Sequence, residues 1–247
     1  MVEGPTAGGH NAPPRGALKL NDKGEPIYGE RDVVDLEKMK PFGLPFWFAG
    51  GYGNPEQVKT VLAAGATGVQ VGTAFALCDE SGMEPSLKQS VLRQVLDDAV
   101  QVFTSPIASP TGFPFKVAQV AGTLSGPELY AARNRICDLG FLRVIVRTDD
   151  GSLNYRCSAE PVDDYMRKGG KLEDTVGRAC LCNNLMATAG YPQRRKDGEV
   201  ERPIVTSGDD LAMMARLASA GKTSYSAEDV VRYLLGLLGQ TPAAQGA

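Results

Sequence analysis

The sequence of 247 residues has no apolar run that approaches the roughly 18 residues a membrane-spanning helix needs. It has no excess of positive charge, since 26 Lys and Arg stand against 29 Asp and Glu and give a net charge of −3. That balance does not favour a nucleic-acid-binding surface. The first residues do not show the basic segment and apolar stretch of a secretory signal peptide. We therefore expect a cytoplasmic protein that binds neither membranes nor nucleic acid.

Histidine and cysteine are also scarce. His10 is the only histidine, and the cysteines number five, an odd count that favours reduced thiols over a disulfide framework. Cys180 and Cys182 form a CxC, not the CxxC of zinc and thioredoxin-type sites. We predict no metal site and interpret the CxC as buried thiols on a helix.

The most informative feature that is present is a pair of glycine-containing motifs about twenty residues apart. Gly50-Gly51 ends the apolar run 46–49, and Gly72-Thr73 ends the run 68–71. Each run indicates a short, buried parallel strand. The segment between them reads PEQVKTVLAAG, which predicts a short helix with Asn54 as its N-cap and Pro55 at its first position.

Glycine allows a backbone to approach a phosphate closely and to point its N–H groups at the anion. In (β/α)₈ barrels, the phosphate site often lies on the loops after the last two strands. The spacing alone leaves two interpretations open, a phosphate cradle or a tight turn between strand and helix that binds nothing.

Residues 49–73, AGGYGNPEQVKTVLAAGATGVQVGT, resemble the phosphate-binding end of the nitronate monooxygenase (2-nitropropane dioxygenase) family. The resemblance includes EGPTAGGH at residues 3–10 and SPTG at residues 109–112, and it covers residues 1 to about 115. It implies a TIM barrel that holds FMN by its phosphate and oxidises alkyl nitronates with oxygen. The substrate would be a small molecule, and the products would be a carbonyl compound and nitrite.

The resemblance also implies roles for individual residues. The family's FMN contacts fall on residues near the two motifs: Gly8, Gly51, Gln70, Val71, Gly72 and Thr73. His10 follows the Gly8-Gly9 pair and would act as the catalytic base or orient the nitro compound. An imidazole at a strand-to-loop junction suits proton transfer near neutral pH.

Glu3 departs from the nitronate monooxygenase pattern, in which glutamine usually stands at this distance from GGH. Glu-Gly is closer to FMN-dependent enoyl reductases, which take hydride from NAD(P)H. A carboxylate cannot donate a hydrogen bond unless it is protonated. The sequence therefore leaves an enoyl reductase as an alternative, and a truncated, non-catalytic chain or subunit as another.

A closed barrel needs eight strands, and the resemblance accounts only for about strands six to eight. We therefore expect an α/β chain in which residues 1–115 form the C-terminal part of a TIM barrel. A missing N-terminal half-barrel or a second copy of the chain would be its partner. Residues 116–247 would form a mainly helical C-terminal extension with a hairpin.

Apolar periodicity elsewhere predicts further elements. The expected helices span residues 32–39, 86–101, 126–139, 161–168, 172–189, 208–220 and 227–238. Two strands at 141–146 and 152–157, joined by the turn signal at 149–151, predict a hairpin. Ser226 is the expected N-cap of the last helix, with Asp229 completing a capping box.

Overall fold

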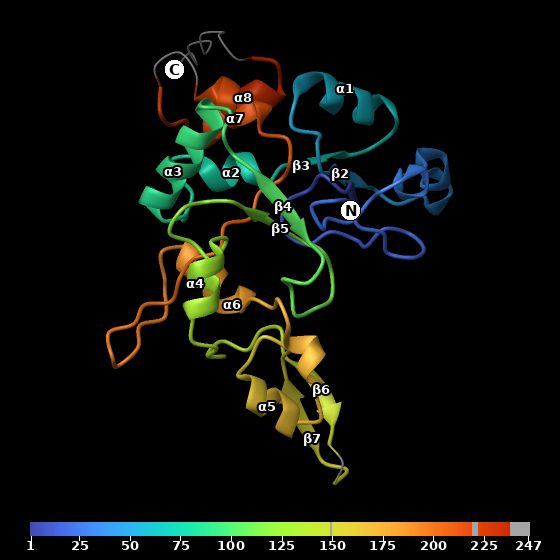
Figure 1. The fold of residues 1–247 in the computed structure, drawn as a ribbon. Helices are drawn as coiled ribbons and strands as arrows, with labels where there is room; N and C mark the ends of the chain where they lie inside the picture. The colour runs from blue at the N-terminus through green and yellow to red at the C-terminus, as the bar shows by residue number, and fades with distance from the viewer. Residues whose placement is uncertain (149, 219–221, 238–247) are drawn as a thin grey trace, which may run out of the picture.

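The computed structural model describes residues 1–148, 150–218 and 222–237. The chain folds into mixed α/β structure with three small sheets (Figure 1). The first sheet is parallel, with the order β1 (Val2–Glu3), β2 (Trp47–Ala49) and β3 (Gly68–Gln70). Val2 pairs with Phe48, and Phe48 pairs with Val69. The three parallel strands agree with the sequence prediction.

Helix α1 (Pro55–Ala63) connects β2 to β3, also as predicted. The Asn54 side chain caps it by accepting a hydrogen bond from the Gln57 N–H, and Pro55 occupies the first turn, where its missing N–H costs nothing. Gly65 follows the helix with φ +94°. A small apolar cluster that includes Phe48 and Val61 lies between this helix and the sheet.

The predicted burial of the strands is wrong for β3. Phe48 and Ala49 of β2 are buried, whereas Val69 is half-buried and Gln70 is exposed. The reason is position, because β2 is the central strand and β3 lies at the edge of the sheet. Only a central strand has neighbours on both sides.

The chain next forms α2 (Thr73–Leu77) and α3 (Pro85–Leu96). The prediction extended this second helix to residue 101, but it ends at Leu96, and Asp98 adopts a left-handed φ of 51°. The antiparallel pair that follows, β4 (Val102–Ser105) and β5 (Phe115–Ala118), was not predicted from the sequence. The two strands pair across the loop 106–114, and no local sequence pattern predicts their register.

Two further helix predictions are wrong. Residues 30–42 form single 3₁₀ turns (Glu30–Asp32, Leu36–Lys38 and Lys40–Phe42), not a helix over 32–39. The expected helix over 172–189 divides into a 3₁₀ turn, Leu172–Thr175, and helix α6 (Leu181–Thr188). Gly177 separates them with φ +72°, a conformation that favours glycine and interrupts a right-handed helix.

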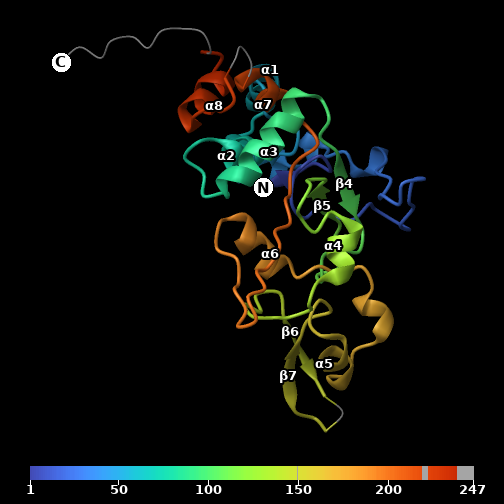
Figure 2. The same cartoon turned by 60° about the vertical axis from the view of Figure 1, so that its left-hand side comes forward.

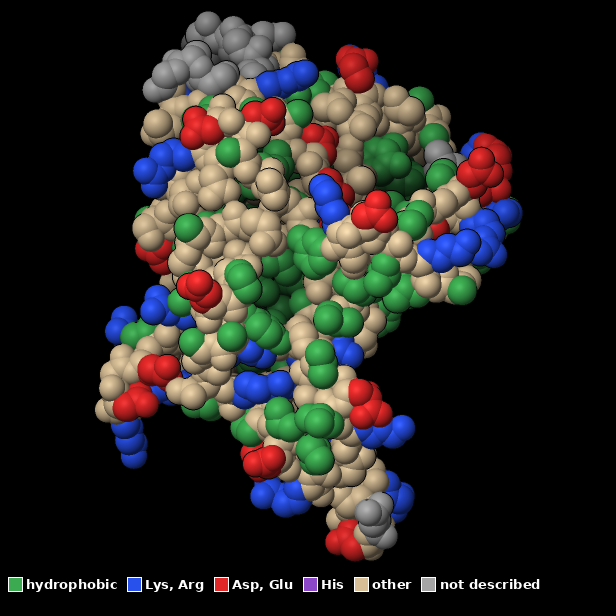
Figure 3. Space-filling model, in the orientation of Figure 1, with side chains coloured by type: hydrophobic (Ala, Val, Ile, Leu, Met, Phe, Trp, Pro, Cys, Tyr) green, Lys and Arg blue, Asp and Glu red, His purple; other side chains and the backbone are tan. Residues whose placement is uncertain are grey.

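The region between α4 (Pro127–Ala132) and α6 projects from the body of the molecule (Figure 1). We call residues 133–178 the hairpin lobe. It contains β6 (Val144–Arg147), β7 (Leu153–Arg156) and α5 (Val162–Arg167). The predicted hairpin and the helix near 161–168 are confirmed, but α4 is much shorter than the predicted helix over 126–139. Hydrophobic side chains, among them Ile145 and Tyr155, are exposed on the lobe, and Figure 3 shows such side chains on its surface.

The C-terminal part returns to the body as α7 (Ala212–Leu217) and α8 (Ala227–Leu234), beside α2 and α3 (Figure 2). Both lie within the predicted ranges 208–220 and 227–238, although residues 219, 220 and 238 are outside the described residues. Ser226 and Asp229 form the predicted capping box.

The main hydrophobic core joins residues from both sides of position 115, since Leu92 and Val95 pack with Val205, Met214 and Val230. The division into regions 1–115 and 116–247 remains a prediction, and the two regions share this core. Among the described helices, none has the length and the apolar character to cross a membrane.

Candidate functional site

A cavity of about 460 Å³ opens where the three parallel strands end. The carboxyl ends of parallel strands are the usual place for a ligand in α/β proteins. All of the site residues predicted from the sequence line this cavity: Gly8, His10, Gly51, Gln70, Val71, Gly72 and Thr73. The structure thus brings them together, and their individual roles remain predictions.

The first glycine motif has a backbone reason. Gly50 and Gly51 have φ of +86° and +81°, which side-chain-bearing residues rarely adopt. A Cβ on Gly50 would also lie 2.8 Å from the Gly4 carbonyl oxygen. The tight-turn interpretation is therefore sufficient to explain this pair, whether or not a ligand binds beside it.

The second motif is different. Gly72 precedes α2 with φ −102°, which any residue can adopt, and no atom lies within 4 Å of where its Cβ would stand. Neither conformation nor packing within the chain requires glycine there. A bare backbone that faces an open cavity fits a group that must approach closely, and the first N–H groups of α2 have no partner inside the helix. A phosphate fits these features.

The opposite wall comes from the C-terminal part of the chain, which the sequence analysis did not include in the site. Thr206, Ser207 and Gly208 line the cavity. A Cβ on Gly8 would lie 2.8 Å from the Gly208 nitrogen, so the close packing of two backbones demands glycine at position 8. The small polar run 206–208 before a predicted helix is the only local signal for this wall.

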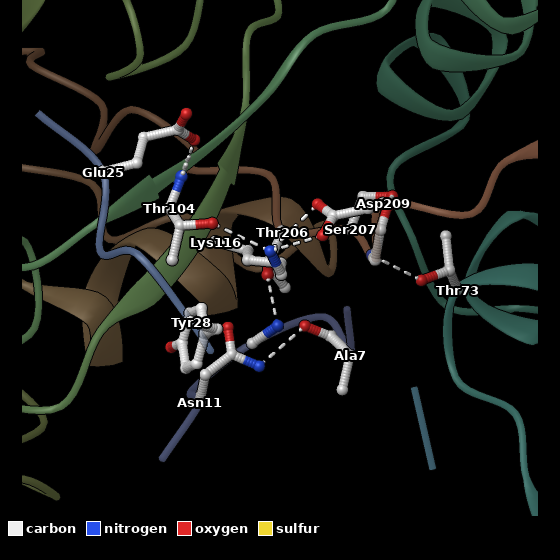
Figure 4. Close-up of polar contacts among 12 residues, drawn as sticks. Ala7, Asn11, Glu25, Tyr28, Thr73, Thr104, Lys116, Thr206, Ser207 and Asp209 are labelled. Atoms are coloured by element: carbon white, nitrogen blue, oxygen red, sulfur yellow. Dashed lines mark hydrogen bonds and ion pairs between the residues drawn. The ribbon is translucent and has the colours of Figure 1, made fainter. Parts of the chain in front are cut away.

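Hydrogen bonds hold the two walls together (Figure 4). The Gly9 N–H donates to Thr206 Oγ1 at 2.8 Å, and the Gly208 N–H donates to Thr73 Oγ1 at 2.9 Å. Thr73 thereby accepts a structural hydrogen bond, and its hydroxyl hydrogen stays available to a ligand.

His10 lies at the rim of the cavity, where it forms an isolated β-bridge with Phe115. Its Nε2 lies 2.6 Å from Ser109 Oγ, within hydrogen-bond distance, and its ring packs edge-on against Phe115. Burial lowers the pKa of His10, because removing water disfavours the imidazolium. The ring is therefore neutral at pH 7 and able to accept a proton. In the SPTG segment, the hydroxyl groups of Ser109 and Thr111 form a hydrogen bond, with 2.8 Å between Oγ and Oγ1.

An ion pair between a buried lysine and a partly exposed aspartate lies behind this wall (Figure 4). Lys116 on β5 donates from Nζ to both Asp209 carboxylate oxygens, at 2.9 and 2.7 Å, and to Thr104 Oγ1 at 2.8 Å. The Lys116 side chain is only 3% exposed. Lys116 and Asp209 line a second cavity of about 470 Å³, and Thr6 lines both cavities. The pair fixes the segment that supplies Ser207 and Gly208.

A glycine-lined cavity at the carboxyl ends of a parallel sheet, with one histidine at its rim, defines an α/β protein with a candidate anion-binding site. Residues 1–111 match the family model for nitronate monooxygenase. This agrees with the resemblance carried by the glycine motifs and by GGH.

Individual relatives are similar over part of the chain. A probable nitronate monooxygenase of Bacillus subtilis is 38% identical over 92 residues, which are 37% of this chain and 25% of that protein. A nitronate monooxygenase of Pseudomonas aeruginosa is 32% identical over 91 residues, 37% of this chain and 24% of that protein. A putative nitronate monooxygenase of Saccharomyces cerevisiae is 30% identical over 140 residues, 52% of this chain and 33% of that protein. The chain thus spans between about a quarter and a third of the length of these relatives.

Proposed function

We propose that the chain belongs to an FMN-dependent oxidoreductase that oxidises alkyl nitronates with oxygen to a carbonyl compound and nitrite. The observation that carries this proposal is the open space at Gly72, in a cavity that collects every site residue expected from the family motifs. The family match over residues 1–111 supports it. When bound, FMN supplies the electron-transfer chemistry that amino-acid side chains lack.

Within this proposal, the three parallel strands are about strands six to eight of a TIM barrel. A further polypeptide segment or a second copy of the chain completes it. In the described residues, the outer edges of β1 and β3 pair with no other strand, and such edges are ready to accept one. A cavity formed by part of a barrel binds its ligand weakly, so we expect weak FMN binding by the chain alone.

The residues have distinct tasks. The backbone N–H groups of Gly51, Gly72 and Thr73 hold the phosphate, and the Thr73 hydroxyl adds a donor. Gln70 is exposed at the end of β3, beside this cradle, and its amide contacts the phosphate or the flavin. His10, held by Ser109, accepts the proton that a neutral nitroalkane loses from carbon.

The main alternative is an FMN-dependent enoyl reductase that uses NAD(P)H, and Glu3 is the observation that favours it. Glu3 lines the cavity, and burial raises the pKa of its carboxyl, which promotes the protonated form that can donate a hydrogen bond. Stopped-flow reduction of the assembled flavoprotein separates the two activities. Bleaching by NADPH favours the reductase, and bleaching by a nitronate favours the monooxygenase.

The variant Gly72→Leu tests the phosphate cradle through the affinity for FMN, so no measurement of enzyme turnover is needed. Leucine is compatible with φ −102°, and its Cβ would have no atom of the described residues within 4 Å, so the unfolding transition should stay near that of the parent. It should weaken FMN binding at least about tenfold, or about 1.4 kcal/mol. Flavin fluorescence titration measures the affinity.

Two controls sharpen this titration. Gly82→Leu lies in an equally open position outside the cavity, so it should leave FMN binding unchanged. Riboflavin lacks the phosphate, so Gly72→Leu should affect it much less than FMN. Equal effects on both flavins, or unchanged FMN affinity, would show that the cradle is misassigned. The remaining alternative is a truncated, non-catalytic chain or subunit. Such a chain would bind neither FMN nor riboflavin, even after it is assembled with the other strands of the barrel.

A further inference from the structure

Four of the cysteines occupy three segments around the hairpin lobe. Cys137 follows α4, and Cys157 follows β7. Cys180 is the N-cap residue of α6, and Cys182 lies in its first turn. All are free thiols. The sequence interpretation of the CxC as buried needs correction, because Cys180 and Cys182 are half-buried.

Hydrogen bonds between the neighbours of these cysteines draw the three segments together. Arg135, two residues before Cys137, donates from Nη2 to the Ser158 carbonyl at 2.6 Å and from Nε to the Glu160 carbonyl at 3.1 Å. Ser158 directly follows Cys157. The segment carrying Cys137 is therefore held against the segment carrying Cys157.

A second set of bonds attaches Cys137 to α6. Asn183 follows Cys182 and is fully buried. Its Nδ2 donates to the Ile136 carbonyl at 3.2 Å and to Asp138 Oδ2 at 2.8 Å. Because Ile136 and Asp138 flank Cys137, one buried side chain on α6 clamps both neighbours of this thiol.

Within this frame, Cys137 and Cys180 lie close enough that each thiol shifts the pKa of the other. The Cys180 thiol as donor and the Arg143 guanidinium lower the pKa of Cys137 to about 6, against burial and the Glu160 carboxylate, which act in the opposite direction. Donating to Cys137 raises the pKa of Cys180. Burial, and to a lesser extent the charge of Cys137, raise the pKa of Cys157. The arrangement pairs a thiolate with a neighbouring protonated thiol.

We propose that Cys137 and Cys180 form a redox-active pair, in which Cys137 reacts with a peroxide and is then closed by Cys180 into a disulfide. The Cys137 thiolate attacks one peroxide oxygen, and the O–O bond breaks to leave a sulfenic acid and, after protonation, water or an alcohol. Cys180 then attacks the sulfenic sulfur, forms the S–S bond and releases water. Two thiols lose two electrons, and the peroxide gains them.

A crosslink at this place has a structural purpose. Within the described residues, Leu142 is the only residue of the hairpin lobe that belongs to a hydrophobic cluster. A lobe with so little core depends on other constraints, and a disulfide supplies one by restricting the unfolded chain. The arrangement of the thiols favours a disulfide between two of them over a metal site. No group of three or more Cys, His, Asp or Glu side chains in the described part of the chain is placed to hold a metal ion.

The test is a native thiol map of the purified 247-residue chain before and after a mild excess of hydrogen peroxide. Mass spectrometry should find one new disulfide-linked peptide pair, Cys137 with Cys180, that dithiothreitol reverses. In the variant Cys180→Ser, the reaction should stop at a sulfenic acid on Cys137, which dimedone traps. Cys137→Ser should abolish both products. Cys182→Ser, a thiol on the same helix turn, is the matched control and should behave as the parent.

A second measurement needs no variant. Alkylation of Cys137 by iodoacetamide in the unmodified chain should show a midpoint near pH 6, well below the usual thiol range around 8.5. A midpoint in the usual range would overturn the proposal, as would a disulfide between another pair of cysteines. Thiols that stay unreactive until a chelator or a mercurial releases a stoichiometric metal would also overturn it, because they would then form a metal site.

Discussion

At the scale of single residues, the glycines of the site serve two purposes that one sequence motif does not distinguish. Gly50 and Gly51 are required by their positive φ, and Gly8 by contact with the backbone of Gly208. At Gly72, no contact or conformation within the described residues requires glycine. A substitution at the first three therefore tests folding, whereas one at Gly72 tests binding. This difference is why the proposed cofactor experiment uses Gly72.

His10 is the residue on which the proposed proton transfer depends. In the assembled enzyme, His10→Asn should reduce turnover of neutral nitroalkanes by about 10²–10⁴-fold, the usual contribution of a positioned base. Pre-formed nitronates have already lost the proton, so their turnover should fall much less. Steady-state rates with both substrates measure the difference. Ser109→Ala removes the Nε2 partner but keeps the imidazole, so its effect should be smaller.

The pH dependence gives an independent check on the same residue. A base acts in its neutral form, and burial lowers the pKa of His10 below its usual 6.5. The acid limb of the nitroalkane profile should therefore lie below pH 6.5 in the parent and disappear in His10→Asn. Equal losses with both substrates would indicate that His10 binds or orients the substrate.

At the scale of elements, β5 carries the least expected residue of the molecule, a buried lysine. Lys116 depends on Asp209, which lies 93 residues further along the chain and is 42% exposed. Asp209→Ala leaves a buried ammonium group without its counter-charge, so it should lower the free energy of unfolding by about 1–3 kcal/mol. Lys116→Met removes the charge itself and should cost less.

Urea denaturation measures both variants, and the double variant should resemble Lys116→Met alone. Glu56→Ala is the control, because it breaks the Lys59–Glu56 pair, whose side chains are 70% and 80% exposed. Exposed pairs are worth at most about 1 kcal/mol. A loss in Asp209→Ala no larger than in this control would show that the pair does not hold the wall.

The accuracy of the sequence predictions for elements follows the range of the interactions that form them. Helix α1 was predictable because Asn54 and Pro55 start it locally, and α8 because Ser226 caps it. The pairing of β4 with β5 was not, because it is closed by contacts across a loop. The single helix expected over 172–189 is interrupted at Gly177, which has a left-handed backbone and whose missing side chain leaves room for Ile107.

For the whole molecule, the core decides which part of the chain can fold alone. The main hydrophobic cluster takes Val205, Met213, Met214, Tyr225 and Val230 from the C-terminal part. Each buried side chain of this kind contributes about 1.5–3 kcal/mol, and total domain stability is only about 5–15 kcal/mol. A chain that ends at residue 200 should therefore lose cooperative unfolding, as circular dichroism on heating would show.

A chain that ends at residue 237 is the control for this truncation. It retains all of the described residues and should unfold in the same cooperative transition as the parent. If residues 1–200 alone gave a cooperative transition, the shared core would not be needed and the family-matching region would be an independent domain.

The candidate site was predictable on one side only. Gly8, His10, Gly51 and residues 70–73 lie in the region that carries the family motifs, and they converge as expected. The opposite wall at residues 206–208 carries no motif. Its position depends on the ion pair between the buried Lys116 and Asp209 and on the core, and both result from packing between distant segments.

The bond between Thr73 and Gly208 has a consequence for biosynthesis. The two residues are 135 positions apart, and a ribosome adding about 5–20 residues per second needs roughly 7–27 s to make that interval. Throughout this time, the motif-bearing strands are already translated, but the second wall of the cavity does not yet exist. If the chain binds FMN as proposed, capture of the flavin by the nascent chain must therefore wait until residue 208 has been made, and cellular chaperones have that interval to cover the open strand edges.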